Sequence, residues 1–315
     1  MTPTTSIPSS VGLVLASLLL TLFPIASVAQ EADTLEAGGI DKKLHRIFTD
    51  DEFEPEEFGP ARWQDDGKYY TTLEPSDTVK DSTDEKAKDI VRYETESGRR
   101  EVIIPAERLV PEGRTRALEI EDYTWSEDKK RLLVFTNTER VWRRNTRGDY
   151  WVMDLATGEL EKLGGDAEPS TLMFAKFSPD GERVAFVRSN NIYVEEIDSG
   201  AIVPVTSDGS ETIINGTSDW VYEEELGIRD GFRWSPDGSQ IAFWNFDSSG
   251  VDKFALINNT DTLYPEVTLI PYPKAGTTNS AARIGVVDAS GGAIRWMKVS
   301  GDPRDTYLAR MEWCD

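Results

Sequence analysis

Short apolar runs separated by polar turns recur along most of the chain. An aromatic residue, a polar turn and an apolar run follow one another in this order four times. The segments read RWQDDGKYYTTL, TWSEDKKRLLVF, KFSPDGERVAFV and RWSPDGSQIAFW, and their aromatic residues are Trp63, Trp125, Phe177 and Trp234. In SPDG, Pro presets the first turn dihedral, Asp bonds back to the backbone and Gly takes a positive φ. The pattern predicts tight turns between antiparallel strands, repeated about every 50 to 60 residues.

The third repeat predicts a full set of four strands. The first ends at Phe177, and the others are Arg183–Val187, Ile192–Ile197 and Ala201–Thr206, with turns at Ser189–Asn191 and Asp198–Gly200. Four antiparallel strands in about fifty residues make up one blade of a β-propeller. Helical periodicity is almost confined to the stretch around Trp220. The sequence therefore predicts an all-β fold, a β-propeller of four-stranded antiparallel blades, with a β-sandwich of short strands as the alternative. The tryptophans of the repeats are expected to be core residues.

Composition narrows the class of protein. With 38% hydrophobic and 29% charged residues, the 315-residue chain can bury a core. Its formal net charge of −23 repels phosphate backbones, so nucleic acid is excluded as a partner. A single cysteine, Cys314, allows no disulfide within the chain, and the single histidine, His45, belongs to no pattern with metal-ligand spacing. The sequence thus predicts no metal site and no cofactor.

The N-terminal segment has a separate character. Val11–Ile25 is an apolar run, and the small residues Ser27 and Ala29 follow it. This arrangement predicts a signal peptide at residues 1–29, with export to the periplasm or the cell exterior. An uncleaved membrane anchor is the alternative. Residues 30–315 are then expected to form one incomplete propeller.

The stretch SDWVYEEELG carries the candidate chemistry. Glu223, Glu224 and Glu225 follow a Trp-Val-Tyr cluster, and three adjacent carboxylates require a cation when they are partly buried. Ser218 or Asp219 is expected to cap a short helix there, whose positive end eases the repulsion. Adjacent helical residues point about 100° apart, so only two of the glutamates can face one ligand. An ion pair between Glu225 and Arg229, one helical turn apart, is the alternative, and Glu223 is assigned to solvent or structure.

These motifs resemble a known family. DWVYEEE, IPYPKAG at Ile270–Gly276 and the Trp-Ser-Pro-Asp-Gly turns are similar to the N-terminal β-propeller of dipeptidyl peptidase IV, a serine exopeptidase of the prolyl oligopeptidase clan, from about residue 40 onward. The resemblance implies that Glu224 and Glu225 bind the α-ammonium group of a peptide substrate. It also implies that Arg143, in ERVWRRN, binds a substrate carbonyl, with Arg144 as the close alternative. Release of N-terminal X-Pro or X-Ala dipeptides is the implied activity.

The motif of the catalytic domain is missing from the sequence. No G-x-S-x-G is present, and the resemblance places the Ser, Asp and His of the triad in an α/β-hydrolase domain that follows the propeller. RMEWCD, with Trp313, looks like the start of another repeat, so a truncated and by itself inactive chain is expected. The expected partners are a peptide with a free N-terminus and the hydrolase domain, and a homodimer of the complete enzyme is compatible with both. A non-catalytic propeller that binds a peptide or protein is the alternative function. An endopeptidase of the same clan has no use for paired ammonium-binding glutamates.

Overall fold

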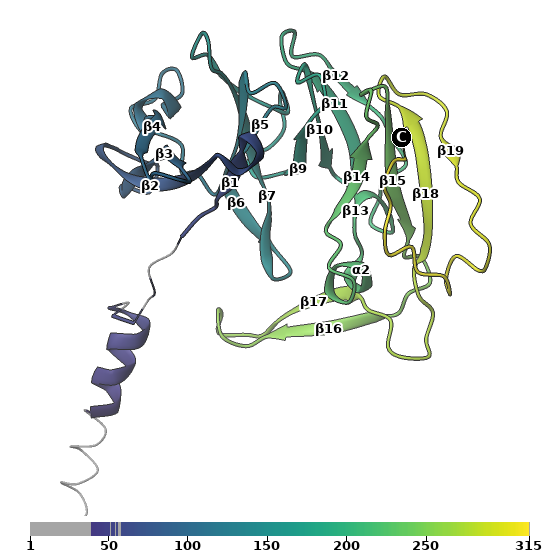
Figure 1. The fold of residues 1–315 in the computed structure, drawn as a ribbon. Coiled ribbons are helices and arrows are strands. Elements are labelled where there is room, and N and C mark those ends of the chain that lie inside the picture. Colours follow the sequence, from purple (N-terminus) through teal and green to yellow (C-terminus); the bar gives the residue numbers. More distant parts are fainter. Residues whose placement is uncertain (1–38, 51, 54, 56–57, 315) are drawn as a thin grey trace, which may run out of the picture. The chain divides into compact units, whose positions relative to one another are not determined.

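The computed structural model describes residues 39–50, 52–53, 55 and 58–314 (Figure 1). The chain divides into two units, Met1–Glu57 and Phe58–Asp315. In the first unit, residues 39–48 are helical, which the repeat pattern did not predict, and His45 is exposed on this helix. The predicted signal peptide lies outside the described residues. Within the described ranges, no helix is both long and apolar enough to cross a membrane.

The second unit is a succession of antiparallel sheets, each built mainly from four strands. The first sheet has the order β1-β2-β3-β4, and its strands are Arg62–Gln64, Tyr69–Lys80, Lys86–Glu94 and Arg100–Ile104. Short 3-10 helices occupy Asp65–Gly67 and Ala106–Leu109. The second set comprises β5 (Asp122–Trp125), β6 (Arg131–Val141), β7 (Arg144–Asp154) and β8 (Leu160–Lys162). The third set comprises β9 (Leu172–Phe177), β10 (Arg183–Arg188), β11 (Asn191–Glu196) and β12 (Ile202–Pro204). Two residue pairs between β7 and β9 join these two sets into one hydrogen-bonded sheet.

The last sheet carries two additions. Its order is β13-β14-β15-β18-β19, and the strands are Ile213–Thr217, Asp230–Trp234, Gln240–Asp247, Ala281–Asp288 and Arg295–Trp296. Helix α2 (Trp220–Glu224) lies between β13 and β14. A separate two-stranded hairpin, β16 (Lys253–Asn258) and β17 (Glu266–Pro271), is inserted between β15 and β18. The four-stranded sets follow one another side by side in Figure 1, as the blades of a propeller do, so the propeller prediction is confirmed over the sandwich.

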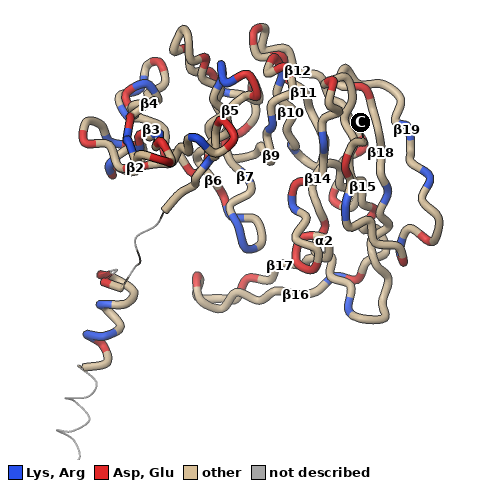
Figure 2. Tube along the Cα trace, in the orientation of Figure 1, with Lys and Arg blue, Asp and Glu red and all other residues tan. Residues whose placement is uncertain are grey.

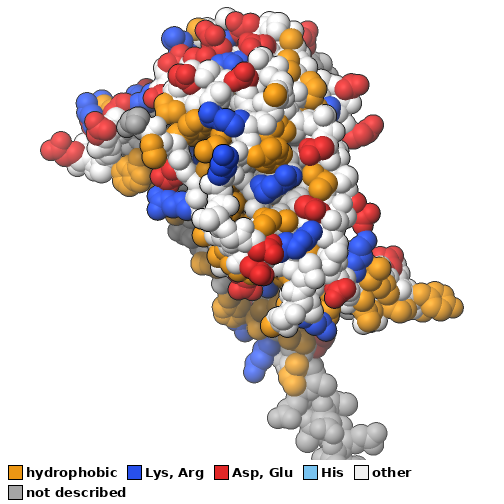
Figure 3. All heavy atoms as spheres, turned by 90° about the vertical axis from the view of Figure 1, so that its right-hand side faces the viewer, with side chains coloured by type: hydrophobic (Ala, Val, Ile, Leu, Met, Phe, Trp, Pro, Cys, Tyr) orange, Lys and Arg blue, Asp and Glu red, His pale blue; other side chains and the backbone are white. Residues whose placement is uncertain are grey.

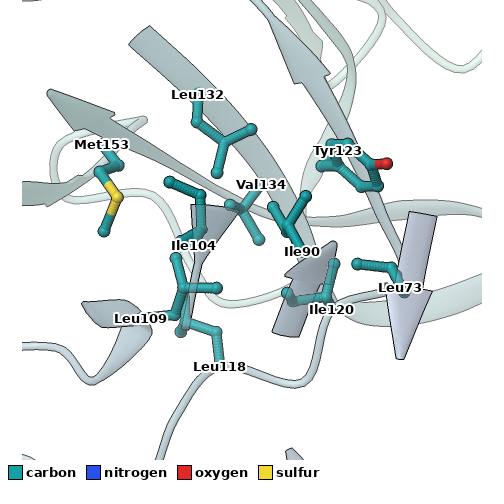
Figure 4. Close-up of a cluster of buried hydrophobic side chains, with 10 residues drawn as sticks. All are labelled: Leu73, Ile90, Ile104, Leu109, Leu118, Ile120, Tyr123, Leu132, Val134 and Met153. Carbon is teal, nitrogen blue, oxygen red and sulfur yellow. The ribbon is translucent and has the colours of Figure 1, made fainter. Parts of the chain in front are cut away.

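Apolar side chains fill the spaces between successive sheets. Ten buried side chains from the first set, the second set and the segment between them converge in Figure 4, namely Leu73, Ile90, Ile104, Leu109, Leu118, Ile120, Tyr123, Leu132, Val134 and Met153. A second cluster joins the third set to the last sheet through residues such as Val187, Ile192, Phe232 and Phe243. Because each sheet buries a face against the next, the unit is held together along its length.

The turns predicted in the second, third and fourth repeats are confirmed, and these three share one hydrogen-bonding pattern. The hydroxyls of Ser126 and Ser235 donate to Asp128 and Asp237 at 2.7 and 2.6 Å, and Ser178 donates to Asp180 in the same way. Gly181 and Gly238 take positive φ angles of 73° and 67°. Side chains within each turn therefore stabilise it locally, as the sequence predicts.

The aromatic residues of the repeats link neighbouring blades. The indole N–H of Trp234 donates to the backbone carbonyl of Lys176 at 3.3 Å, and that of Trp313 donates to the carbonyl of Arg233 at 3.2 Å. Trp313 therefore occupies the position that the repeat pattern assigns to it. Trp63 does not follow the expectation of a core residue, because it is 68% exposed.

Acid should weaken the turns between strands. Hydrogen bonds lower the pKa of Asp128, mainly through Lys130, and that of Asp237, mainly through Ser235, each to about 2. Both pKa values lie below those of the unfolded chain. The stabilisation that the two ionised carboxylates contribute is therefore complete above about pH 4 and is lost as the pH falls toward 2. We expect the urea midpoint to fall over this window, and to fall less in the variant Asp128→Asn/Asp237→Asn. An equal decline in both proteins would contradict the prediction.

Charge is unevenly spread over the surface. On the face shown in Figure 3, acidic side chains gather toward the upper end, while Lys and Arg side chains lie among apolar ones below.

Candidate substrate-binding site

The acidic stretch forms a short helix on a tightly closed loop. Strands β13 and β14 pair at Gly216–Gly231 and Thr217–Asp230, and α2 lies on the loop between them. The Asp219 carboxylate accepts the Tyr222 N–H at 3.0 Å, so Asp219 rather than Ser218 is the N-cap. Burial raises the pKa of Asp219, and hydrogen bonds from Ser280 and the Tyr222 backbone oppose that rise.

The segment around Leu308 supports one face of helix α2. The Tyr222 side chain is buried and packs on Phe246, with 4.5 Å between ring centroids. Its hydroxyl accepts the Leu308 N–H at 2.8 Å, and the Trp244 indole donates to the Leu308 carbonyl, also at 2.8 Å. One face of α2 is therefore fixed, which leaves the opposite face for the site.

An ion pair between Lys176 and Asp230 holds the start of β14, where the loop that carries α2 ends. Lys176 on β9 donates to both carboxylate oxygens of Asp230 at 2.6 and 2.8 Å, and to the Phe232 carbonyl at 2.6 Å. Burial lowers the pKa of Lys176 to about 8, against the opposing effect of Asp230. All three ammonium protons are thus used in tying the third set of strands to β14.

The three glutamates point to three different environments. Glu223 is buried and pairs with Arg229 at 3.3 Å, and burial raises its pKa while Arg229 opposes the rise. Of the two roles expected for Glu223, solvent exposure or a structural role, the structure shows the second. The alternative pairing of Arg229 with Glu225 is wrong, because the helix ends at Glu224 and the two residues are not one helical turn apart.

Glu224 meets the predicted arginine. The long β6–β7 hairpin has a two-residue tip, Trp142–Arg143, and Trp142 takes the positive φ of 54° that such a tip favours. The Arg143 Nε lies 2.8 Å from Oε2 and 3.0 Å from Oε1 of Glu224. The side chain of Glu224 is 15% exposed and that of Arg143 is 71% exposed. Figure 2 shows the basic tip of this hairpin near the acidic residues of α2.

Glu225 completes the group. It is exposed, and within the described ranges it has no ion-pair partner. Arg144 belongs to β7 and, in the same part of the chain, makes no ion pair. The structure thus brings Arg143 and Glu224 together, and the exposed Glu225 follows Glu224 directly in the chain. This arrangement can accept a further cation that donates several hydrogen bonds.

Aromatic side chains border the acidic group, and sequence reasoning missed their role. Trp142 packs edge-on against Trp220 with centroids 4.9 Å apart, and Trp220 lies 5.3 Å from Tyr272. Tyr272 belongs to the PYPKAG motif, which the sequence marked only as a family feature. The sequence feature that could have indicated this aromatic border is the joint presence of DWVYEEE and PYPKAG.

Among the described residues, no group of three or more His, Cys, Asp or Glu side chains is arranged to hold a metal ion. Cys314 is an exposed free thiol.

Comparison with known proteins decides the family. The profile described as "Dipeptidyl peptidase IV (DPP IV) N-terminal region" matches residues 126–315, more than half of the chain. The chain belongs to the dipeptidyl peptidase IV family. The matched region includes α2, both long hairpins and two of the four aromatic residues that define the repeats, Phe177 and Trp234.

Individual members of the dipeptidyl peptidase IV family agree with this assignment. Dipeptidyl aminopeptidase B of Saccharomyces cerevisiae is 37% identical over 196 residues, which cover 61% of this chain and 23% of the yeast protein. The crystal structure of Porphyromonas gingivalis dipeptidyl peptidase 4 superposes with a TM-score of 0.70 at 30% identity, over 82% of this chain and 35% of the bacterial one. The chain therefore spans about a quarter to a third of the length of these relatives.

Proposed function

We propose that this chain is the substrate-gating part of an exported serine exopeptidase, which releases N-terminal X-Pro or X-Ala dipeptides by proteolysis. Its partner within the complete enzyme is an α/β-hydrolase domain that supplies Ser, Asp and His. The observation that carries the proposal is the pairing of Arg143 with Glu224, from two elements far apart in sequence, next to the exposed Glu225. The names of the relatives, which are dipeptidyl peptidases, support it.

The three residues divide the recognition of the peptide between them. Glu224 and Glu225 accept hydrogen bonds from the substrate's α-ammonium group, and the exposed Arg143 donates to the carbonyl of a neighbouring substrate residue. The pairing of Arg143 with Glu224 keeps both side chains oriented before the peptide arrives. Each charge-assisted hydrogen bond contributes about 1.5–3 kcal/mol, so two of them can favour an ammonium over an acylated amine by about a hundredfold. A fixed distance from the glutamates to the nucleophile then sets the cut after the second residue.

A comparison of free and blocked substrates tests the proposed function. The complete protein should hydrolyse Ala-Pro p-nitroanilide with a kcat/KM about a hundredfold or more above that for N-acetyl-Ala-Pro p-nitroanilide. The matched substrates differ only at the amine, so the ratio reports recognition of the charged N-terminus. Equal rates on both substrates would contradict the gating role, and hydrolysis of neither would contradict the exopeptidase.

We also propose that the complete enzyme is a homodimer in which the β16–β17 hairpin takes part. Register places Ile257 opposite Val267 and Ala255 opposite Leu269 on one face of this hairpin. The three large residues of this face are exposed, and Leu263 and Tyr264 near the turn are 93% and 79% exposed. A contiguous apolar surface of this kind is typical of an interface, and a twofold axis allows the same patch to serve both copies.

Acidic substitutions on this face of the β16–β17 hairpin should dissociate the proposed dimer. We expect the variant Ile257→Asp/Val267→Asp of the complete protein to sediment as a monomer at a concentration where the unmodified protein is a dimer, because two carboxylates in an apolar interface are strongly disfavoured. Circular dichroism should remain unchanged, since both side chains are exposed. A monomeric unmodified protein, or an unaffected dimer of the variant, would exclude this interface.

A further inference from the structure

An apolar groove lies directly beside the acidic group. It has a volume of about 400 Å³, and its walls include Trp220, Phe254, Leu256, Ile270, Tyr272 and Pro273. Phe254 and Tyr272 pack together, with centroids 5.5 Å apart. In Figure 1 the β16–β17 hairpin runs beneath α2, and the groove is formed between these elements. Proteins expose such apolar concavities mainly where they bind something.

The hairpin presents two different faces, and only one of them lines the groove. Phe254 pairs with Ile270, and both side chains lie on the groove face, as does Leu256. Ile257 and Leu269 alternate with them and therefore point to the opposite face. The groove is thus separate from the surface assigned above to contact between copies, although one hairpin carries both.

Trp220 connects the groove to the acidic group. Trp220 and Glu224 are four residues apart on α2, so they share one face and lie about 6 Å apart along the helix axis. The tip of the β6–β7 hairpin contacts both of them, since Trp142 packs on Trp220 and Arg143 pairs with Glu224. The groove and the carboxylate are therefore one helical turn apart on a continuous surface.

The distance between the groove and the Glu224 carboxylate indicates which group the groove can bind. In a bound peptide, the carbon that carries the ammonium group also carries the first side chain, and a Leu, Phe or Tyr side chain extends on the order of 5–6 Å from it. We propose that the groove binds the side chain of the first substrate residue, so that the enzyme prefers peptides beginning with a large apolar or aromatic residue. Lys274 at the rim, 5.6 Å from the Phe254 ring centroid, disfavours Lys or Arg at this position. The inference rests on the proposed function, because the glutamates must hold the amine.

Matched double variants of the complete protein test the groove. The substrates are Phe-Pro and Gly-Pro p-nitroanilides, and the measured quantity is the ratio of their kcat/KM values. We expect a ratio of about ten for the unmodified protein, because a half-buried aromatic side chain gains roughly that factor over glycine. The variant Phe254→Ser/Leu256→Ser removes two groove walls and should bring the ratio close to one. The control Ile257→Ser/Leu269→Ser alters the other face of the same hairpin, and its ratio should stay near ten even if separated copies turn over more slowly.

The outcomes separate this inference from the proposed function. If free dipeptidyl substrates are hydrolysed but the ratio stays near ten in Phe254→Ser/Leu256→Ser, the groove does not bind the first side chain and only this inference fails. A ratio that falls equally in the control would assign the effect to the hairpin as a whole, and would also overturn the inference. If calorimetry shows no binding of Phe-Pro amide or Gly-Pro amide and neither substrate is cleaved, the proposed function fails and the groove loses its assigned ligand.

Discussion

Replacing Glu224 or Glu225 with Gln in the complete protein is expected to lower kcat/KM on Ala-Pro p-nitroanilide by about a hundredfold for each variant. Glutamine keeps the shape of the side chain but removes the charge that answers the ammonium group. Glu224 is held by Arg143 at 2.8 Å, so its replacement also releases the arginine, and we expect the larger loss there. The loss at Glu225, which is exposed, should lie mainly in KM because this residue has no structural partner among the described residues.

The acetylated substrate serves as an internal control for these variants. Since its amine carries no charge, its slow hydrolysis should change little, and the free-to-acetylated ratio should collapse toward one. Glu182→Gln, at an exposed position in a turn of the third repeat, should leave both rates unchanged. Unchanged kinetics on the free substrate in both glutamate variants would remove the carboxylates from substrate binding.

Replacing Gly231 with Ala is expected to lower the free energy of unfolding by about 2–3 kcal/mol. An added Cβ would lie 2.7 Å from the Gly216 carbonyl carbon and 2.7 Å from the Thr217 nitrogen. Both are backbone atoms at the base of the loop that carries α2, so no flexible side chain can move aside. The strands must separate at the pair that closes this loop, and we expect KM for free dipeptidyl substrates to rise as well.

Urea unfolding measures the first effect, and steady-state kinetics measures the second. Gly39→Ala is the matched control, because its added Cβ meets nothing within 4 Å and its φ is not positive. A Gly231→Ala protein as stable as the unmodified one would show that the paired glycines are not needed for close approach of the two strands.

Local sequence predicted the parts of the fold that depend on local chemistry. The Ser-x-Asp turns could be identified because the side chains that stabilise them lie within two residues of each other. The repeat of aromatic residues predicted the blades, and the hydrogen bond of Trp313 confirms that the pattern continues to the end of the described chain. The hairpin of β16 and β17 was not predicted, since both of its faces are apolar and no turn of the repeat type marks it.

The site was predictable only in part, for a similar reason. The acidic cluster showed that a cation is required, but its partners come from elements distant in sequence, and only the resemblance pointed to Arg143. Spacing alone suggested Arg229 as the partner of Glu225. In the structure Arg229 pairs with Glu223 instead, because the helix ends at Glu224 and the chain turns through Gly227 with a φ of 67°. Where a short helix ends depends on tertiary support, which sequence spacing does not contain.

The support of α2 by Leu308 also orders events during synthesis. Leu308, whose N–H donates to the Tyr222 hydroxyl and whose carbonyl accepts the Trp244 indole N–H, is synthesised 86 residues after Tyr222. Until that segment leaves the exit tunnel, helix α2 lacks the hydrogen bonds to Leu308, and only its contacts with earlier elements, such as the pair of Arg143 with Glu224, can orient it. The proposed affinity for peptide N-termini should therefore develop late in synthesis, after most strands of the described chain have formed.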